Sequence, residues 1–156
     1  MDNTKLHFMT AEFVPLLRNA DRNTAAKWGK MSFQQMVEHV ADFFKVSSNK
    51  VQLPLVTAIE HLPKYKEFLL SDKQFRENTK APTAVLGDEP LPVRNPNMEI
   101  AISKLQHQID SFVSYFQQNP DAKTCHPVFG ELDFSEWVLL HYKHVIHHAR
   151  QFGLVS

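Results

Sequence analysis

One stretch of this chain repeats apolar residues with the period of an α-helix more strictly than any other. Residues 98–116 place an apolar side chain at every third or fourth position, which lines one face of a helix. Asn95 followed by Pro96 suits the start of that helix, and Asn119 followed by Pro120 suits its end. The chain is therefore expected to build its core from packed amphipathic helices. The apolar positions are Met98, Ala101, Ile102, Leu105, Ile109, Phe112, Val113 and Phe116.

Two weaker helical patterns precede this stretch. Thr10 is the expected cap of a first helix that runs to Asn19. Ser32 and Gln35 have the spacing of a capping box, in which each side chain bonds the backbone of the other residue, and they predict a second helix ending near Asn49.

A last helix is predicted near the end of the chain. Asp133 and Glu136 suit its cap and the partner three residues on, and Gly153 suits its left-handed end. No segment alternates apolar and polar residues as a strand does, so the predicted fold class is all-α.

The connection between the second and third helices is unusually long. Residues 51–95 contain five prolines and only one short helical pattern, around residues 57–70. Such a crossover excludes simple up-and-down order. We therefore expect a four-helix bundle with a long crossover between helices 2 and 3, and residues 1–156 are of a size that suits a single domain.

Charge and composition limit the partners that this chain is expected to bind. Seventeen basic residues balance seventeen acidic ones, so no net field attracts nucleic acid or anionic lipid. The first residues lack a signal peptide, and no window is apolar enough to span a membrane. The single cysteine, Cys125, has no internal disulfide partner and agrees with a reducing compartment. We expect a cytoplasmic protein.

Histidine is the residue type that most needs an explanation. The chain has nine, and four of them lie between positions 141 and 148. At about 100° per residue, His141, His144 and His148 share the core-facing side of their helix, whereas His147 falls with charged residues and is expected to be solvated.

The spacing of these histidines predicts a metal site. His144 and His148 lie one helical turn apart, so both imidazoles can reach one ion. Buried imidazoles need partners, and a third ligand from a facing helix would complete the site. His39 borders the apolar stripe of the second helix and is the best candidate. Asp42 and Glu38 are candidates for orienting a ligating ring by accepting its free N–H, but a solvated charge on the helix is the favoured interpretation of each.

Other histidines and the cysteine can be interpreted in more than one way. His141 is a candidate catalytic residue, but it also fits a fourth ligand, an orienting donor or simple core packing. His126 is expected to fix the turn before the last helix, and a nucleophilic Cys125 is the less favoured reading. His7, His61 and His107 carry no supporting pattern.

Residues 143–151 resemble the histidine signature on the last helix of the DinB/YfiT superfamily of metalloenzymes. Residues 31–39 are similar to the segment that supplies the third ligand in that family. Segments 126–130, 136–137 and 141–153 resemble one branch of the superfamily in particular. In the crossover, the likeness is limited to residues 62–63, 71–73 and 78–82.

The resemblance implies that His39, His144 and His148 bind one metal near the end of a four-helix bundle, with a pocket above it. Some members of the superfamily transfer low-molecular-weight thiols or isomerise thiol adducts. This chain departs from them in a shorter first helix and a longer crossover, which would shape the pocket and change the substrate.

Three neutral imidazoles with an open position are typical of a catalytic zinc site, whereas structural sites are usually closed by four ligands. Zinc is the first expectation for the cofactor, and nickel, iron and manganese also accept imidazole. A metal there lowers the pKa of a bound water or thiol, as hydrolysis or thiol transfer requires. The leading hypothesis is a metal-dependent transferase or hydrolase acting on a small molecule.

Two further hypotheses stay open. A binding or sensing module would hold the metal without turnover, and its site would be closed by a fourth protein ligand. A bundle without metal would act through dimer contacts, and a homodimer is one arrangement open to such a bundle.

Overall fold

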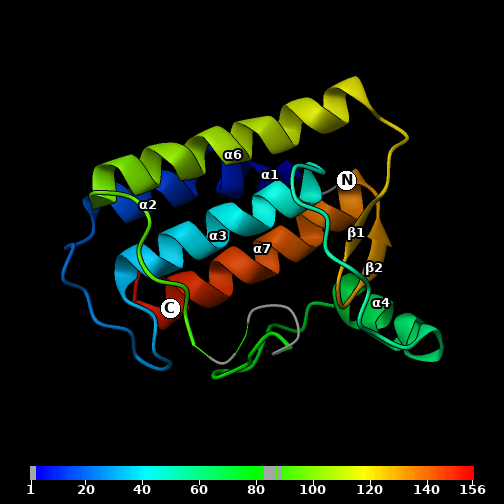
Figure 1. Cartoon of the computed structure of the whole chain (residues 1–156), viewed down its shortest axis with the longest axis horizontal. Helices are drawn as coiled ribbons and strands as arrows, with labels where there is room; N and C mark the ends of the chain where they lie inside the picture. The colour runs from blue at the N-terminus through cyan, green and yellow to red at the C-terminus, as the bar shows by residue number, and fades with distance from the viewer. Residues whose placement is uncertain (1–2, 83–86, 88) are drawn as a thin grey trace.

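Helices make up most of this protein in the computed structural model, which describes residues 3–82, 87 and 89–156. Helices α3 (Phe33–Ser47), α6 (Met98–Gln118) and α7 (Phe134–Gln151) are the longest, and they lie side by side (Figure 1). A small two-stranded sheet accompanies them. The mostly helical fold class predicted from the apolar periodicity is confirmed.

The amino-terminal helix is longer than predicted and has three parts: α1 (Asn3–His7), the π-helical turn η1 (Phe8–Glu12) and α2 (Phe13–Asn19). The predicted cap at Thr10 is therefore wrong. Its hydroxyl donates back to the carbonyl of Leu6, at 2.9 Å, within the helical arm. The sequence signal misled because Thr hydroxyls make this backward bond as readily as they cap.

The capping boxes predicted for two helices are confirmed. At the start of α3, Ser32 accepts from the backbone N–H of Gln35, whose side chain accepts from Ser32 in return. Asp133 and Glu136 make the same reciprocal bonds at the start of α7. Gly153, with φ of 70°, ends α7 in the left-handed conformation as expected.

Helix α6 begins two residues later than the Asn95 and Pro96 pair predicted. The cap is Asn97, whose side chain accepts from the backbone N–H of Ile100. Asn95 instead uses its backbone to contact α3, since its N–H donates to Glu38 and its carbonyl accepts from Gln34. A tertiary contact therefore decides which asparagine caps the helix.

The long connection returns the chain to the end of the molecule where α3 starts, so α3 and α6 run in the same direction while α7 runs against them (Figure 1). This crossover contains the 3-10 turn η2 (Ile59–His61) and helix α4 (Leu62–Leu70). The short helix predicted around residues 57–70 is confirmed.

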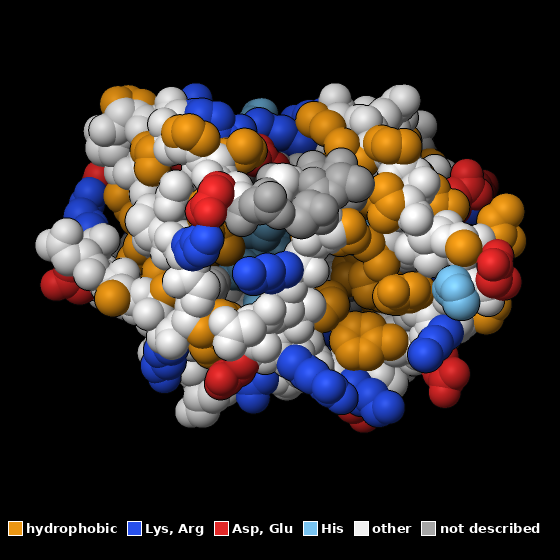
Figure 2. Space-filling view, turned by 60° about the horizontal axis from the view of Figure 1, so that its bottom comes forward, with side chains coloured by type: hydrophobic (Ala, Val, Ile, Leu, Met, Phe, Trp, Pro, Cys, Tyr) orange, Lys and Arg blue, Asp and Glu red, His pale blue; other side chains and the backbone are white. Residues whose placement is uncertain are grey.

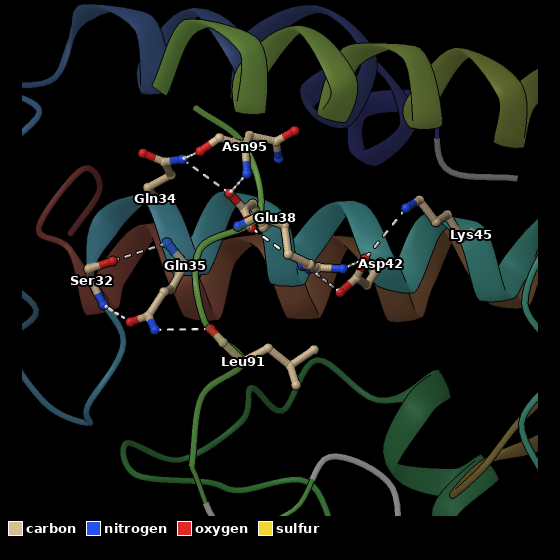
Figure 3. Close-up of polar contacts among 9 residues, drawn as sticks. Ser32, Gln34, Gln35, Glu38, Asp42, Lys45, Leu91 and Asn95 are labelled. Carbon is tan, nitrogen blue, oxygen red and sulfur yellow. Dashed lines mark hydrogen bonds and ion pairs between the residues drawn. The ribbon is translucent and has the colours of Figure 1, made fainter. Parts of the chain in front are cut away.

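The last part of the crossover, residues 91–95, forms a strap that is fastened to α3 (Figure 3). The buried carboxylate of Glu38 accepts from the backbone N–H of Arg94 at 2.8 Å and of Asn95 at 3.2 Å. The Gln35 side chain donates to the carbonyl of Leu91, and the Arg94 guanidinium pairs with Asp42. The strap therefore lies along the helix that carries His39.

A short antiparallel hairpin precedes α7, contrary to the expectation of a chain without strands. Strands β1 (Thr124–His126) and β2 (Gly130–Leu132) pair so that Thr124 lies opposite Leu132. Each strand has three residues, too few for an alternating pattern to stand out in the sequence. The described part of the chain contains no helix that is long and apolar enough to cross a bilayer.

Candidate metal centre

His39, His144 and His148 meet between helices α3 and α7. The Nε2 atom of His144 lies 3.0 Å from Nε2 of His39 and 3.1 Å from Nε2 of His148. Ligand atoms of all three side chains lie within 4.8 Å of one another, and no other His, Cys, Asp or Glu in the described ranges joins this group. The fold thus brings together the three histidines that the sequence singles out.

The surroundings of the cluster keep its imidazoles neutral. The Phe43 ring packs edge-on against His39 at 5.1 Å and His144 at 4.9 Å between ring centroids. Burial lowers the pKa of His39 to about 4 and holds the pKa values of His144 and His148 well below the usual 6.5. Neutral imidazole is the form that binds a metal, so the cluster is ready to do so at neutral pH.

Gln151 orients one of these rings. Its Oε1 lies 2.7 Å from Nδ1 of His148, and its Nε2 donates to the backbone carbonyl of Trp28 at 3.0 Å. That second bond fixes which end of the amide faces the histidine. His148 therefore carries its proton on Nδ1 and presents the lone pair of Nε2 to the cluster.

The close approach of Trp28 to Gln151 depends on the next residue, Gly29. Its φ is +79°, in the left-handed region, and a Cβ at this position would lie 2.9 Å from Nε2 of Gln151. Sequence reasoning did not single out Gln151 as an orienting residue. The available signal was its place three residues after His148 on the same helix.

Asp42 and Glu38, the candidates for orienting a ligand, neither do so nor stand as free solvated charges. Asp42 accepts from the Arg94 guanidinium, and Glu38 accepts from the backbone N–H groups of Arg94 and Asn95. No described hydrogen bond joins either carboxylate to His39. Burial disfavours ionisation of Glu38, but hydrogen bonds from the Arg94 backbone, Gln34 and Asn95 outweigh it and lower the pKa. These carboxylates hold the strap.

His141 lies outside the three-histidine cluster, one turn before His144. It is 1% exposed, its Nε2 lies 2.8 Å from Oγ of Ser47, and its ring stacks on Phe44 with 3.9 Å between centroids. Since the Ser47 hydroxyl donates to the Phe44 carbonyl, it accepts from His141. The catalytic role of His141 stays a prediction.

His147 is not solvated, which corrects the expectation from the helical wheel. It is 8% exposed, and its ring contacts Trp28 and Phe75, with centroids 5.6 Å and 5.9 Å away. Lys143 on the same face is also buried, and its Nζ donates to the carbonyls of Ser71 and Lys73. The crossover covers a face that looks polar on the wheel.

The turn role predicted for His126 is confirmed. Its Nδ1 accepts from the backbone N–H of Val128 at 3.0 Å and of Phe129 at 3.2 Å. Burial raises the pKa of the Cys125 thiol, so at neutral pH this cysteine is the less reactive protonated form. The described positions of His7, His61 and His107 are all exposed and outside the cluster.

A cavity of about 1670 Å³ opens over the histidine cluster, large enough for a sizeable organic molecule. Figure 2 shows its face of the molecule, with histidine side chains deep in a hollow, hydrophobic side chains beside it and Lys and Arg side chains around it. Its walls come from α3, α7, the hairpin and the crossover. The loop before α3 adds residues 28–31, and the crossover supplies more of the lining than any other segment.

The comparisons with known proteins agree with this arrangement. A search of curated proteins and a search of solved structures each returned no significant match. A family model, described as the DinB superfamily, matches residues 6–152 and so includes all three clustered histidines. On this match over nearly its whole length, the chain belongs to the DinB superfamily.

Proposed function

We propose that this protein is a metal-dependent enzyme in which His39, His144 and His148 hold one divalent ion beside the substrate. The observation that carries this proposal is the convergence of three Nε2 atoms, from two helices, at the floor of a large cavity. Zinc is the first choice for three imidazoles, and nickel, iron and manganese accept the same ligands.

The separations of the nitrogens suit a shared ion. Nitrogens held about 2.0 to 2.1 Å from zinc at tetrahedral angles are about 3.3 Å apart. The distances from His144 Nε2 to its two neighbours, 3.0 and 3.1 Å, are close to that value. The third pair also stays within 4.8 Å.

The proton positions favour a metal over a trio of histidines bonded only to each other. Gln151 holds the proton of His148 on Nδ1, so Nε2 of His148 carries a lone pair. If His144 carries a proton on Nε2, that proton can point to only one of its two neighbours. At least one lone pair is then left without a donor, whereas one cation would satisfy all three nitrogens.

An enzyme is favoured over a closed structural site because the described residues supply three ligands and a cavity lies above them. A divalent metal held there supplies a Lewis acid that lowers the pKa of a water or thiol in its open position. The chain's own residues orient the imidazoles and keep them neutral, as Gln151 and the surrounding apolar rings do. Thiol transfer and hydrolysis are the reactions that we propose, on a small molecule.

His141 fits a positioning role better than proton transfer. Its Nε2 is held by Ser47, and its ring is stacked between Phe44 and Trp137. From there it supports the helix turn that carries His144. We also infer that the amino-terminal helical arm completes a four-helix bundle with α3, α6 and α7, as the family likeness implies.

The proposal is tested first by elemental analysis of protein made without a histidine tag. We expect about one metal per chain in the wild type and in His107→Ala, which changes an exposed histidine, and loss of that metal in His39→Ala and His148→Ala. Metal retained in both cluster variants, or no metal in any protein after incubation with zinc, would contradict the site.

A second measurement separates an enzyme from a binding module. Cobalt(II) replaces zinc and has a visible spectrum that changes when a ligand enters its coordination shell. We expect added mercaptoethanol or azide to change this spectrum saturably, and the zinc protein to catalyse either thiol addition to a chloronitrobenzene or hydrolysis of a nitrophenyl ester. An unchanged spectrum and no turnover would favour the module.

A further inference from the structure

Trp137, on the second turn of α7, carries a polar group that lacks a partner. Its side chain is fully buried, and among the described residues its Nε1 is the one buried side-chain nitrogen or oxygen without a hydrogen bond. Leaving a buried N–H unpaired forfeits its hydrogen bonds to water, so native proteins seldom do so without a functional reason. Trp137 also lines the cavity above the histidine cluster.

His126, at the end of β1, offers a second donor to the same cavity. Its Nδ1 accepts two backbone N–H groups, from Val128 and Phe129, and so carries a lone pair. Burial lowers the pKa of His126 to about 3, which keeps the ring neutral. Its one proton must then lie on Nε2, and no described residue accepts a hydrogen bond from that atom.

The two donors are neighbours and lie close to the predicted ligands. The rings of His126 and Trp137 have centroids 5.6 Å apart. Phe43 stacks on His126 at 5.8 Å and contacts the ring of His144 at 4.9 Å, so a single phenyl ring lies between His126 and the cluster. Both donors and the histidine cluster line the same cavity.

The charges around the cavity favour an anionic molecule. The acidic side chains that line it within the described ranges are already paired, Glu38 and Asp42 with Arg94, and Glu89 with Lys30. By contrast, Lys64, Arg76 and Lys80 line the cavity without an ion pair to any residue that the structure describes. Unpaired cations at the mouth of a cavity attract anions and raise their local concentration.

We propose that His126 Nε2–H and Trp137 Nε1–H together bind a carboxylate of the substrate, which is then a small organic acid with an apolar body. This inference rests on the proposed function, because it places the acid beside the same cluster. An aromatic wall that includes Tyr65, Phe68 and Phe129 suits the apolar body. Two neutral N–H donors suit a carboxylate, whose oxygens only accept.

The test uses the indole N–H resonances of the full-length protein labelled with nitrogen-15, with and without zinc. The chain has two tryptophans, and Trp137→Phe assigns the signals. Acetate, benzoate and phenylacetate serve as probes, with benzylamine as the cationic control. We expect at least one acid to move the Trp137 signal saturably, in a direction typical of a new hydrogen bond, and benzylamine to leave it in place.

Calorimetry of two variants then measures how much each N–H donor contributes to the affinity for the acid. Trp137→Phe removes one N–H, and His126→Asn removes the other while its side-chain oxygen can still accept from the turn. Each is expected to weaken binding of the acid about 10-fold or more, as loss of a charge-assisted hydrogen bond does. Tyr142→Phe, which removes a polar hydrogen from an aromatic ring on the same helix but outside the lining of the cavity, is the matched control and is expected to bind as the wild type does.

Failure of this inference differs from failure of the proposed function. If no acid moves the Trp137 signal, or if both variants bind the acid as tightly as the wild type, the carboxylate subsite is wrong even where zinc is bound. If the protein binds no metal but the Trp137 signal responds and both variants weaken binding, the subsite stands and the metal proposal falls. Because the wild-type signal is read directly and either Trp137→Phe or Trp28→Phe assigns it, one variant that fails to fold does not prevent the decision.

Discussion

The side chain of Gln151 joins His148 to the backbone carbonyl of Trp28, with 2.7 Å to the histidine and 3.0 Å to the carbonyl. One amide thereby ties the last turn of α7 to the loop after α2. The residue that orients the proposed ligand is thus itself held by a main-chain atom from a distant part of the chain, which makes the orientation of His148 a property of the whole fold.

Gln151→Ala is expected to weaken metal binding about 10 to 100-fold, because loss of an outer partner frees the ring of a ligand. The affinity is measured by competition with a zinc-binding dye. Gln117→Ala, an exposed glutamine on α6, is the control and is expected to leave the affinity unchanged. Equal affinities for both variants would show that Gln151 does not orient the ligand.

Gly29→Ala is expected to lower both stability and metal affinity. A side chain at φ of +79° costs about 1–2 kcal/mol, and the new Cβ would push on Nε2 of Gln151. Gly87→Ala meets the same backbone strain at φ of +73°, but no described atom beyond its chain neighbours lies within 4 Å of the added carbon. Urea unfolding should therefore detect both changes, while zinc competition should detect only Gly29→Ala.

Ser47→Ala is expected to destabilise the fold by about 1–3 kcal/mol, because it leaves the buried Nε2–H of His141 unpaired. Ser48→Ala is the matched control, since Ser48 also donates to the carbonyl of Phe44 but does not contact His141. Thermal unfolding compares the two. If Ser47→Ala costs no more than Ser48→Ala, the hydrogen bond to His141 contributes little.

Glu38→Gln is expected to loosen the strap and to lower stability by about 1–3 kcal/mol. The buried carboxylate accepts from two backbone N–H groups, and an amide would turn a donor toward one of them. Glu131→Gln, at an exposed position in β2, is the control. Hydrogen exchange of the amides of residues 91–95 measures directly how firmly the strap is held. Unchanged protection of Arg94 and Asn95 would contradict the prediction.

The stability of the metal-free protein is expected to fall as the pH drops below about 6.5. Burial lowers the pKa of His39 to about 4 and that of His126 to about 3, so the unfolded chain takes up protons that the folded chain excludes. Each such histidine contributes a slope of about 1.4 kcal/mol per pH unit, with full stability above its unfolded pKa. Urea unfolding between about pH 6.5 and 5 measures the slope. His126→Asn should reduce this slope by the contribution of one histidine. An unchanged slope would show that His126 does not have a lowered pKa in the folded protein.

The sequence predicts best those features that depend on residues close together along the chain. Both capping boxes, the left-handed turn at Gly153 and the pairing of His144 with His148 need only local spacing, and the structure has all of them. Even the approach of His39 follows from the apolar faces of two helices, since each must be buried against the other.

Several features that the sequence did not predict depend on contacts between distant segments. His147 is buried because the crossover folds over its face, and Asn97 rather than Asn95 caps α6 because Asn95 is engaged by α3. The role of Gln151 depends on a carbonyl 123 residues away. Helical periodicity carries no information on such contacts.

Several of the bonds that fasten the crossover to the helices use its own main chain. Glu38 accepts from the amides of Arg94 and Asn95, Gln35 donates to the carbonyl of Leu91, and Lys143 donates to carbonyls at Ser71 and Lys73. Attachment of this kind is largely indifferent to the identity of the attached residues. Mutation can therefore redraw the roof of the cavity while the ligating helices stay as they are, which gives evolution, or a protein engineer, a route to new substrates on an unaltered metal-binding frame.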